Sequence, residues 1–211
     1  MKKITKVLTS LGVAALALTA SCSQPNQSTA GENTSKADAA QIVLDNIMTR
    51  TSIRQFTSQP IAKDTLDMIV KAGMAAPTAM NKQPWAFVVV TEKEVLDSLG
   101  AVHPYSNLKT ATAAIIVCGD MEKAATDFAR EYWIQDCSAA TENILLAAHA
   151  LGIGAVWCGV YPNPKVMPEV KRVLSLPSWV IPLNIITMGY PEAASQPKDK
   201  WVPENVHYQK W

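Results

Sequence analysis

The stretch IQDCSAATENILLAAHAL, Ile134–Leu151, carries the strongest helical pattern of the chain. Apolar residues recur at three- and four-residue spacing and cover much of the helix circumference. The residues available for packing are Ala139, Ala140, Ile144, Leu145, Ala148 and Leu151. Gly152 follows directly, and glycine often ends a helix because it adopts the left-handed conformation easily. A helix that is apolar on most sides is buried, so we expect this one to be central.

Further elements are predicted on both sides of this helix. Helical spacing of apolar residues predicts helices at 41–48, 66–76, 91–100 and 167–174. Thr91 and Glu94 predict a capping box for the third of these, and Gly100 predicts its end. Apolar, β-rich runs predict buried strands at 86–90, 112–118 and 181–188.

The N-terminus is typical of a targeting signal. Three lysines precede an apolar run, Val7–Ala20, and Ser21-Cys22 follow. This pattern resembles a bacterial lipoprotein signal, with residues 1–21 cleaved and Cys22 acylated; ordinary secretion with a spare thiol is the alternative. Residues 22–39 are mostly small and polar and predict a disordered tether. One domain, 40–211, remains, and the predicted location is the cell envelope with a lipid anchor as the only membrane attachment.

Composition excludes several classes of function. The formal net charge of the 211-residue chain is only +1, which argues against a nucleic-acid partner. Cys118, Cys137 and Cys158 are scattered and do not have metal-ligand spacing with any histidine. We therefore expect no disulfide framework and no metal, and interpret these cysteines as buried small apolar residues.

Several polar and aromatic residues have less distinctive patterns. Asp136 and Glu142 are expected to be acids that are solvated or favoured by the helix dipole, and His149 a packing residue or a complement to the helix C-terminus. His103 lies in a predicted loop and is expected to be solvated; the alternative is that it faces a substrate. Phe128, Tyr132 and Trp133 predict an aromatic patch that belongs to the core, a dimer face or a lid.

The first chemically informative stretch is Arg50-Thr51-Ser52-Ile53-Arg54, at the end of the predicted helix 41–48. It combines two guanidinium groups and two hydroxyls, which suit a phosphate or the polar edge of a heterocycle. The alternative is a solvated helix end whose arginines complement the terminal carbonyl groups.

The second is Ala76–Trp85, APTAMNKQPW, a predicted loop that leads into the strand 86–90. Asn81 and Gln83 each have donor and acceptor atoms, so they could recognise a ring with mixed carbonyl and N–H edges. Trp85 could add a flat apolar wall. The alternative is a turn whose amide side chains cap backbone groups.

With these two stretches the sequence resembles the nitroreductase family of flavin enzymes. RTSIRQF is similar to the family's N-terminal Arg-x-Ser-x-Arg motif, and APTAMNKQPWAFVVV to its second signature. Gly152–Gly159 resembles its Gly-x-Gly-x-x-Trp-x-Gly segment, where glycines let the backbone approach the flavin and its neighbours, and Gly189-Tyr190-Pro191 resembles its Gly-Tyr-Pro. These glycines do not follow a strand and open a helix, so a Rossmann dinucleotide fingerprint is rejected.

The resemblance implies an α+β fold with a mixed central sheet flanked by helices, an obligate homodimer, and FMN in two sites built from both subunits. In the family a basic residue of the C-terminal tail meets the flavin phosphate, and Lys200, or else Lys198, matches it. Asn81 and Gln83 would approach the ring from the partner chain. The residues implied to bind the cofactor are Arg50, Thr51, Ser52, Arg54, Pro77, Thr78, Asn81, Gln83, Trp157, Gly159, Lys198 and Lys200.

The implied activity is ping-pong hydride transfer through flavin N5 to electron-poor acceptors such as nitroaromatics or quinones, with no catalytic side chain. Two alternatives stay open. One is a reductive dehalogenase or flavin-breakdown relative, for which the short stretch 100–110 leaves little room for a lid. The other is a non-enzymatic surface lipoprotein that binds FMN. The predicted location also questions the donor, because NAD(P)H is cytoplasmic; a membrane redox partner or reduced flavin is the alternative.

Overall fold

The computed structural model describes residues 28–211, with side chains from residue 36 onward. The chain divides into two compact units, Met1–Ala39 and Ala40–Trp211, and every candidate cofactor residue belongs to the second. The predicted signal peptide and Cys22 lie outside the described residues. The boundaries of the signal peptide and tether stay predictions.

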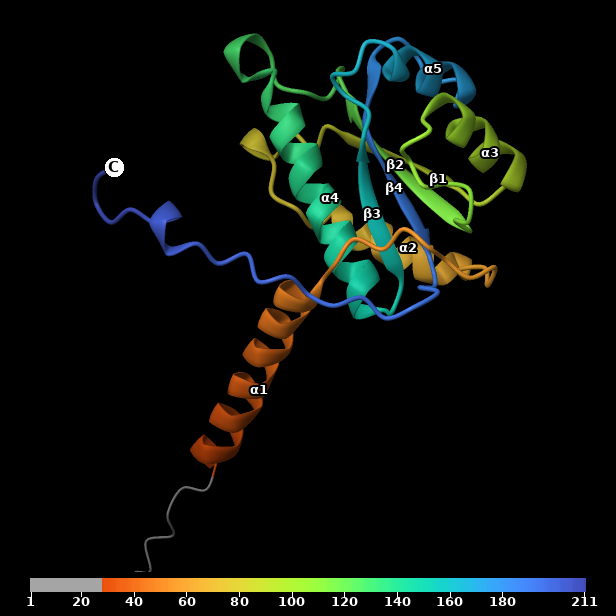
Figure 1. The fold of residues 1–211 in the computed structure, drawn as a ribbon. Coiled ribbons are helices and arrows are strands. Elements are labelled where there is room, and N and C mark those ends of the chain that lie inside the picture. The colour runs from red at the N-terminus through yellow and green to blue at the C-terminus, as the bar shows by residue number, and fades with distance from the viewer. Residues whose placement is uncertain (1–27) are drawn as a thin grey trace, which may run out of the picture. The chain divides into compact units, whose positions relative to one another are not determined.

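A four-stranded sheet forms the centre of the second unit (Figure 1). Its strands are β1 (Trp85–Val90), β2 (Ala113–Asp120), β3 (Gly154–Gly159) and β4 (Val180–Gly189). They are ordered β1-β2-β4-β3. Three of them contain the predicted apolar runs. The fourth, β3, is a strand where the sequence predicted only a glycine-containing segment.

Every pairing between these four strands is antiparallel, so the predicted mixed sheet is wrong in this respect. The helix α4 (Tyr132–Ala150) joins β2 to β3, which point the same way. β4 lies between them and runs opposite to both, which makes each neighbouring pair antiparallel. The parallel contact in the described chain is an isolated bridge between Ser52 and Ala155. The α+β fold with flanking helices is confirmed.

Helices cover both faces of the sheet (Figure 1). On one face lie α4, central as predicted, and α2 (Lys63–Gly73). On the other lie α3 (Lys93–Val102) and α5 (Val166–Val173). Side chains alternate along β2, so Ile115 faces α4 while Ile116 faces α3 and α5. Both are fully buried, and burial of such a side chain contributes about 1.5–3 kcal/mol.

The predicted capping box of α3 does not form. The N-cap residue is Glu92, which makes no side-chain capping hydrogen bond. Glu94 is therefore one position too early in the helix to reach back. Gly100 lies inside the helix instead of ending it. A glycine there costs about 1 kcal/mol, and the buried Leu96 and Leu99 hold the turn against the core.

The first helix, α1 (Ser28–Thr49), begins inside the segment predicted to be a disordered tether. Alanines at 37, 39 and 40 are strong helix formers and extend the helix predicted at 41–48 toward the N-terminus. Its apolar side chains from residue 42 onward are 48–71% exposed: Ile42, Val43, Leu44, Ile47 and Met48. Asn46 donates to the Leu146 carbonyl of α4 at 3.1 Å. The described part of this chain leaves that apolar surface uncovered.

Three short 3-10 helices complete the secondary structure: η1 (Ala79–Asn81), η2 (Asp127–Ala129) and η3 (Pro203–Asn205). The C-terminal segment from Glu192 is exposed and leads away from the sheet (Figure 1). None of the helices described between residues 28 and 211 is long and apolar enough to span a membrane.

Candidate functional site

A strongly basic cavity lies where α1 leads into the core domain. Residues 50–56, here called the basic arm, provide four of its lining residues, and the C-terminal segment provides the rest. The cavity measures about 260 Å³ and is lined by Arg50, Thr51, Ser52, Arg54, Ser195, Gln196, Lys198 and Lys200. The structure thus brings together six of the predicted cofactor residues, which come from two distant parts of the sequence.

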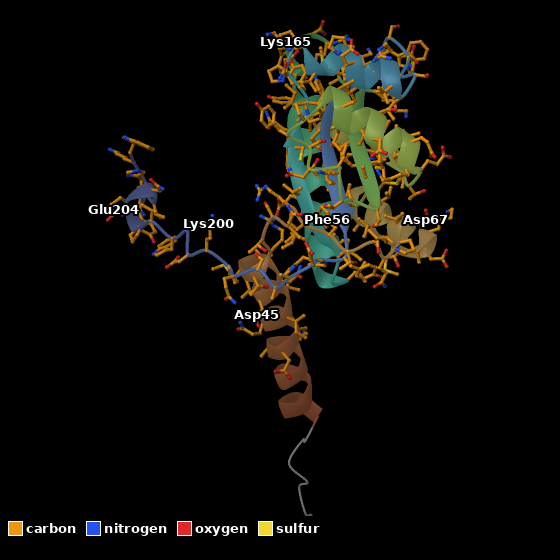
Figure 2. The ribbon with its side chains drawn as sticks, turned by 45° about the vertical axis from the view of Figure 1, so that its right-hand side comes forward. Asp45, Phe56, Asp67, Lys165, Lys200 and Glu204 are labelled. Carbon is orange, nitrogen blue, oxygen red and sulfur yellow. The ribbon has the colours of Figure 1, made fainter. Side chains whose placement is uncertain are left out.

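Backbone contacts fix the basic arm along the edge strand β3. The Ile53 N–H donates to the Ala155 carbonyl at 3.0 Å. Phe56 forms an isolated bridge with Pro191 just beyond β4, and Figure 2 shows its side chain close to the sheet. The Ser195 hydroxyl donates to the Thr51 hydroxyl at 2.6 Å, which joins the C-terminal segment to the arm.

Two glycines of the recognised motifs make this close packing possible. A Cβ on Gly154 would lie 2.8 Å from Cγ2 of Ile53. A Cβ on Gly189 would lie 2.7 Å from Cβ of Phe56. Gly154 thus allows the basic arm of its own chain to approach β3 closely. Gly159 is open: nothing lies within 4 Å of an added Cβ.

The cations of this cavity differ in how far they are neutralised. The Arg50 Nε lies 3.4 Å from a Glu142 carboxylate oxygen. Arg54 donates only to the Ser52 carbonyl, at 3.4 Å. In the described part of the chain, Arg54, Lys198 and Lys200 form no salt bridge. Figure 2 shows Lys200 on the extended C-terminal segment. Three uncompensated positive charges and three hydroxyls suit an anion with several oxygen atoms.

A second cavity of about 400 Å³ adjoins the first and shares Arg50, Thr51 and Ser195 with it. Its lining includes His149, whose Nε2 lies 3.0 Å from the Thr49 hydroxyl. Burial, and then the Arg50 guanidinium, lower the pKa of His149 from its ordinary value. The histidine near the end of α4 therefore contacts the end of α1, a more specific role than a helix-terminus complement.

The second predicted stretch, residues 77–83, is here called the amide loop. Met80, Asn81 and Gln83 all have left-handed φ angles, of 52°, 53° and 50°. The Gln83 Nε2 donates to the Asn81 Oδ1 at 3.0 Å, and both side chains are exposed. Pro77 and Thr78 line a cavity of about 510 Å³ together with residues of α4. Its α4 residues are Tyr132, Gln135, Asp136 and Ala139.

The amide loop and the basic arm therefore line different cavities of one chain. Trp157 and Gly159 lie on β3. Both are exposed, although they belong to the sheet face against which α4 packs. Six of the twelve predicted residues line the basic cavity, four lie on the amide loop and two lie on β3.

Several polar residues lie elsewhere than the sequence predicted. Asp136 is not solvated: it is 6% exposed and accepts the Ala79 N–H at 2.8 Å. His103 is buried as well, with its Nε2 2.8 Å from the Gly159 carbonyl. Glu142, by contrast, is exposed as predicted, and it pairs with Arg50. These partners are separated by dozens of positions, so no local pattern could have linked them.

The aromatic patch does not exist as one surface. Trp133 is core and meets Tyr161 edge-on, with 5.0 Å between ring centroids. Phe128 and Tyr132 are exposed. The interpretation of Cys118, Cys137 and Cys158 as buried free thiols is confirmed. Between residues 28 and 211, no three His, Cys, Asp or Glu side chains are grouped so that they could hold a metal ion.

The donor set of the basic cavity fits FMN, whose phosphate monoester is a dianion at neutral pH. Guanidinium, ammonium and hydroxyl groups are the usual ligands of such a phosphate. The exposed amides of the amide loop offer donors and acceptors for a flavin ring edge. The residues present are thus compatible with both ends of the cofactor.

Comparison with known proteins agrees with this geometry. The family model described as "Nitroreductase family" matches residues 47–103 and 101–190. A protein of Methanothermobacter thermautotrophicus, provisionally named NADH dehydrogenase/NAD(P)H nitroreductase, is 42% identical over 80% of this chain and 87% of its own. A solved structure from Bacteroides thetaiotaomicron with the same provisional name is 42% identical, with a TM-score of 0.75 over 81% of this chain and 98% of that one.

A third relative is named for its cofactor. It is an FMN-dependent nitroreductase of Clostridium difficile R20291, 29% identical, with a TM-score of 0.73 over 80% of this chain and 99% of that one. The family match covers the basic arm, the amide loop and all four strands. The chain belongs to the nitroreductase family.

Proposed function

We propose that this protein is an FMN-dependent oxidoreductase that passes reducing equivalents from a donor such as NAD(P)H to an electron-poor acceptor, such as a nitroaromatic or a quinone. The observation that carries the proposal is the basic cavity between the arm and the C-terminal segment. Relatives named as FMN reductase and FMN-dependent nitroreductase support the cofactor and the reaction. Bound FMN would supply the redox chemistry, accepting and donating hydride at N5.

The chain's own residues bind and orient the cofactor. Arg54, Lys198 and Lys200 would neutralise the phosphate, and the Ser52 and Thr51 hydroxyls would donate to its oxygen atoms. Arg50 is already paired with Glu142, so it would contribute a shared rather than a full charge. Phosphate contacts of this kind hold the cofactor in place without taking part in hydride transfer.

The amide loop would recognise the ring. Asn81 and Gln83 already bond to each other through their side chains, which leaves the Gln83 carbonyl and the Asn81 amide group for the flavin edge. Trp157 and Gly159 would border the same space from β3. None of these groups titrates near neutral pH, which agrees with an enzyme whose side chains position the cofactor rather than transfer protons.

We also propose that the functional unit is a homodimer with sites built from both subunits. The apolar residues of α1, exposed in the single chain, need a covering partner. The basic arm and the amide loop line different cavities, and a second copy could supply the missing half of each site. Sedimentation of the purified protein tests this proposal: a monomer at micromolar concentration with FMN bound would contradict it.

The N-terminal sequence supports a further proposal, that Cys22 is acylated and the protein is held in the cell envelope. NAD(P)H would be scarce there, so the physiological donor would be a membrane redox partner or a diffusible reduced flavin. Cell fractionation tests both statements. A cytosolic protein with an uncleaved signal would contradict them.

The function itself is tested by the absorption spectrum of the purified full chain, before and after anaerobic NADH or NADPH. We expect a yellow protein that bleaches and recovers its colour with a nitroaromatic or a quinone. Bleaching by dithionite but not by nicotinamides would indicate another donor or a flavin-storage role. A colourless protein that cannot be reconstituted with FMN would overturn the cofactor assignment.

A further inference from the structure

The amide loop has a backbone conformation that most of its residue types disfavour. Left-handed φ angles at three non-glycine residues, Met80, Asn81 and Gln83, are unusual within four positions. Asparagine tolerates this region better than most residues, whereas methionine and glutamine do not. Such strain persists only where surrounding contacts over-determine the conformation.

Most hydrogen bonds of this loop are internal. The Gln83 N–H donates to the Thr78 hydroxyl at 3.1 Å, and the Asn81 N–H to the Thr78 carbonyl at 3.1 Å. Within the described chain, one hydrogen bond links residues 77–83 to another element: the Ala79 N–H donates to Oδ1 of Asp136 at 2.8 Å. Internal bonds give the turn its shape, and the bond to Asp136 ties it to α4.

Asp136 is well placed to act as that fixed point. It lies in the first half of α4 beside Cys137, which is fully buried. One turn further, Thr141 accepts a hydrogen bond from the Asn184 amide of β4 at 2.9 Å, so this part of α4 is tied to the sheet. The carboxylate therefore lies on a part of α4 that is hydrogen-bonded to the sheet.

A buried carboxylate is a costly way to make one hydrogen bond. Burial raises the pKa of Asp136, and the Ala79 N–H only partly opposes this by lowering it. An apolar residue of similar size would fill the space without that cost. The carboxylate thus has a purpose beyond packing, and the group it contacts belongs to the loop that carries Asn81 and Gln83.

We propose that Asp136 is a positioning residue: by holding the Ala79 N–H, its carboxylate fixes the left-handed turn that presents Asn81 and Gln83 to the flavin ring. The inference rests on the proposed function, because the turn has this role only if FMN binds. In this role Asp136 acts through the backbone of Ala79, whose N–H its carboxylate accepts.

The test compares cofactor binding by Asp136→Leu, Asp136→Asn and the wild-type chain, measured by quenching of flavin fluorescence. Losing a hydrogen bond to a charged group corresponds to a change of about tenfold or more. We expect Asp136→Leu to weaken FMN and riboflavin binding equally, by about tenfold, because the loop acts on the ring. Asp136→Asn keeps an acceptor oxygen and should restore most of the affinity. Glu131→Leu removes an exposed acid from the start of the same helix and should change nothing.

A second variant reaches the same contact from the other side, in case Asp136→Leu does not fold. Ala79→Pro removes the donor N–H, and the extended backbone of Thr78, at φ −137° and ψ 153°, is the conformation that precedes proline. It should lose the same affinity as Asp136→Leu. The double variant should lose no more than either single one, because both changes remove one interaction.

The outcomes separate the two proposals. Wild-type affinity in both Asp136→Leu and Ala79→Pro would overturn the role of Asp136 and leave the proposed function intact. So would an equal loss in Asp136→Asn and Asp136→Leu, since the acceptor would then not matter. A wild-type chain that binds neither FMN nor riboflavin would overturn both proposals.

Discussion

The basic arm and the amide loop would bind one cofactor by different physical means. The arm has no left-handed residue, lies along β3 through backbone contacts, and carries its function in charge. The loop carries its function in neutral amides, on a backbone with three left-handed residues. A phosphate can be bound from many directions by any cluster of cations, whereas a ring edge must be met at fixed positions. Strain is therefore found where geometry matters, and not where charge is enough.

The largest effect should come from removing the charge. Arg50→Ala with Arg54→Ala should weaken FMN binding at least about a hundredfold, since each hydrogen bond to a charged group contributes about 1.5–3 kcal/mol. Riboflavin, which lacks the phosphate, should bind as it does to the wild-type chain. Fluorescence titration measures both affinities.

Arg172→Ala is the matched control for this pair. Arg172 lies on α5, is exposed, and pairs with Glu169, so its loss should leave both affinities unchanged. If riboflavin binding fell together with FMN binding in the double variant, the division into a charge-based and a geometry-based region would be wrong.

The next effect should come from displacing the arm without altering its charge. Gly189→Ala puts a Cβ 2.7 Å from Cβ of the buried Phe56, which has no room to move. Overpacking of this kind costs about 1–3 kcal/mol. We expect a lower thermal midpoint and about tenfold weaker FMN binding.

Gly100→Ala serves as its control. That Cβ would meet Leu108 at 3.5 Å, an ordinary contact, inside a helix where alanine is preferred to glycine. Its thermal midpoint should not fall. Unchanged stability and FMN affinity in Gly189→Ala would mean that the arm is not seated by Phe56.

A smaller effect should distinguish the backbone of the amide loop from that of the basic arm. Met80→Gly relieves a left-handed residue of the amide loop and should stabilise the protein without cofactor, by about 0.5–1 kcal/mol. Gln55→Gly, in the basic arm, removes a side chain from unstrained backbone and should destabilise by a similar amount. Urea unfolding measures both changes. The same sign in the two variants would show that the loop stores no strain.

The arm was predictable from the sequence and the conformation of the loop was not. Arg50, Arg54, Lys198 and Lys200 are charged wherever they lie, and the motif placed two of them within five residues. The two lysines join them in one cavity because the segment after β4 returns to Thr51. Nothing in the sequence APTAMNKQP indicates that Met80 has a left-handed φ angle.

Asp136 shows why the rest could not be predicted. An acid in the first half of a helix is usually solvated, and its partner Ala79 is 57 positions away.

The strand order could not be predicted for the same reason. Apolar runs predicted β1, β2 and β4, but the antiparallel order depends on β4 lying between β2 and β3, and β3 was predicted only as a glycine-containing segment. Pairings across the chain are decided by packing that single-sequence patterns do not contain.

The smallest effect concerns how far the positive potential of the arm extends. Burial and Arg50 lower the pKa of His149 below its ordinary 6.5, so the folded chain favours the neutral ring more than the unfolded chain does. The unfolded state then binds more protons between the two pKa values, and stability must fall as pH drops below about 6.5.

His149→Gln should remove that part of the pH dependence in urea unfolding. Arg50→Ala should reduce it, because the positive charge beside the ring is gone, while burial continues to lower the pKa. Gln83→Ala, in the amide loop, should leave it unchanged. An equal change in all three variants would mean that the field around His149 does not come from the basic arm.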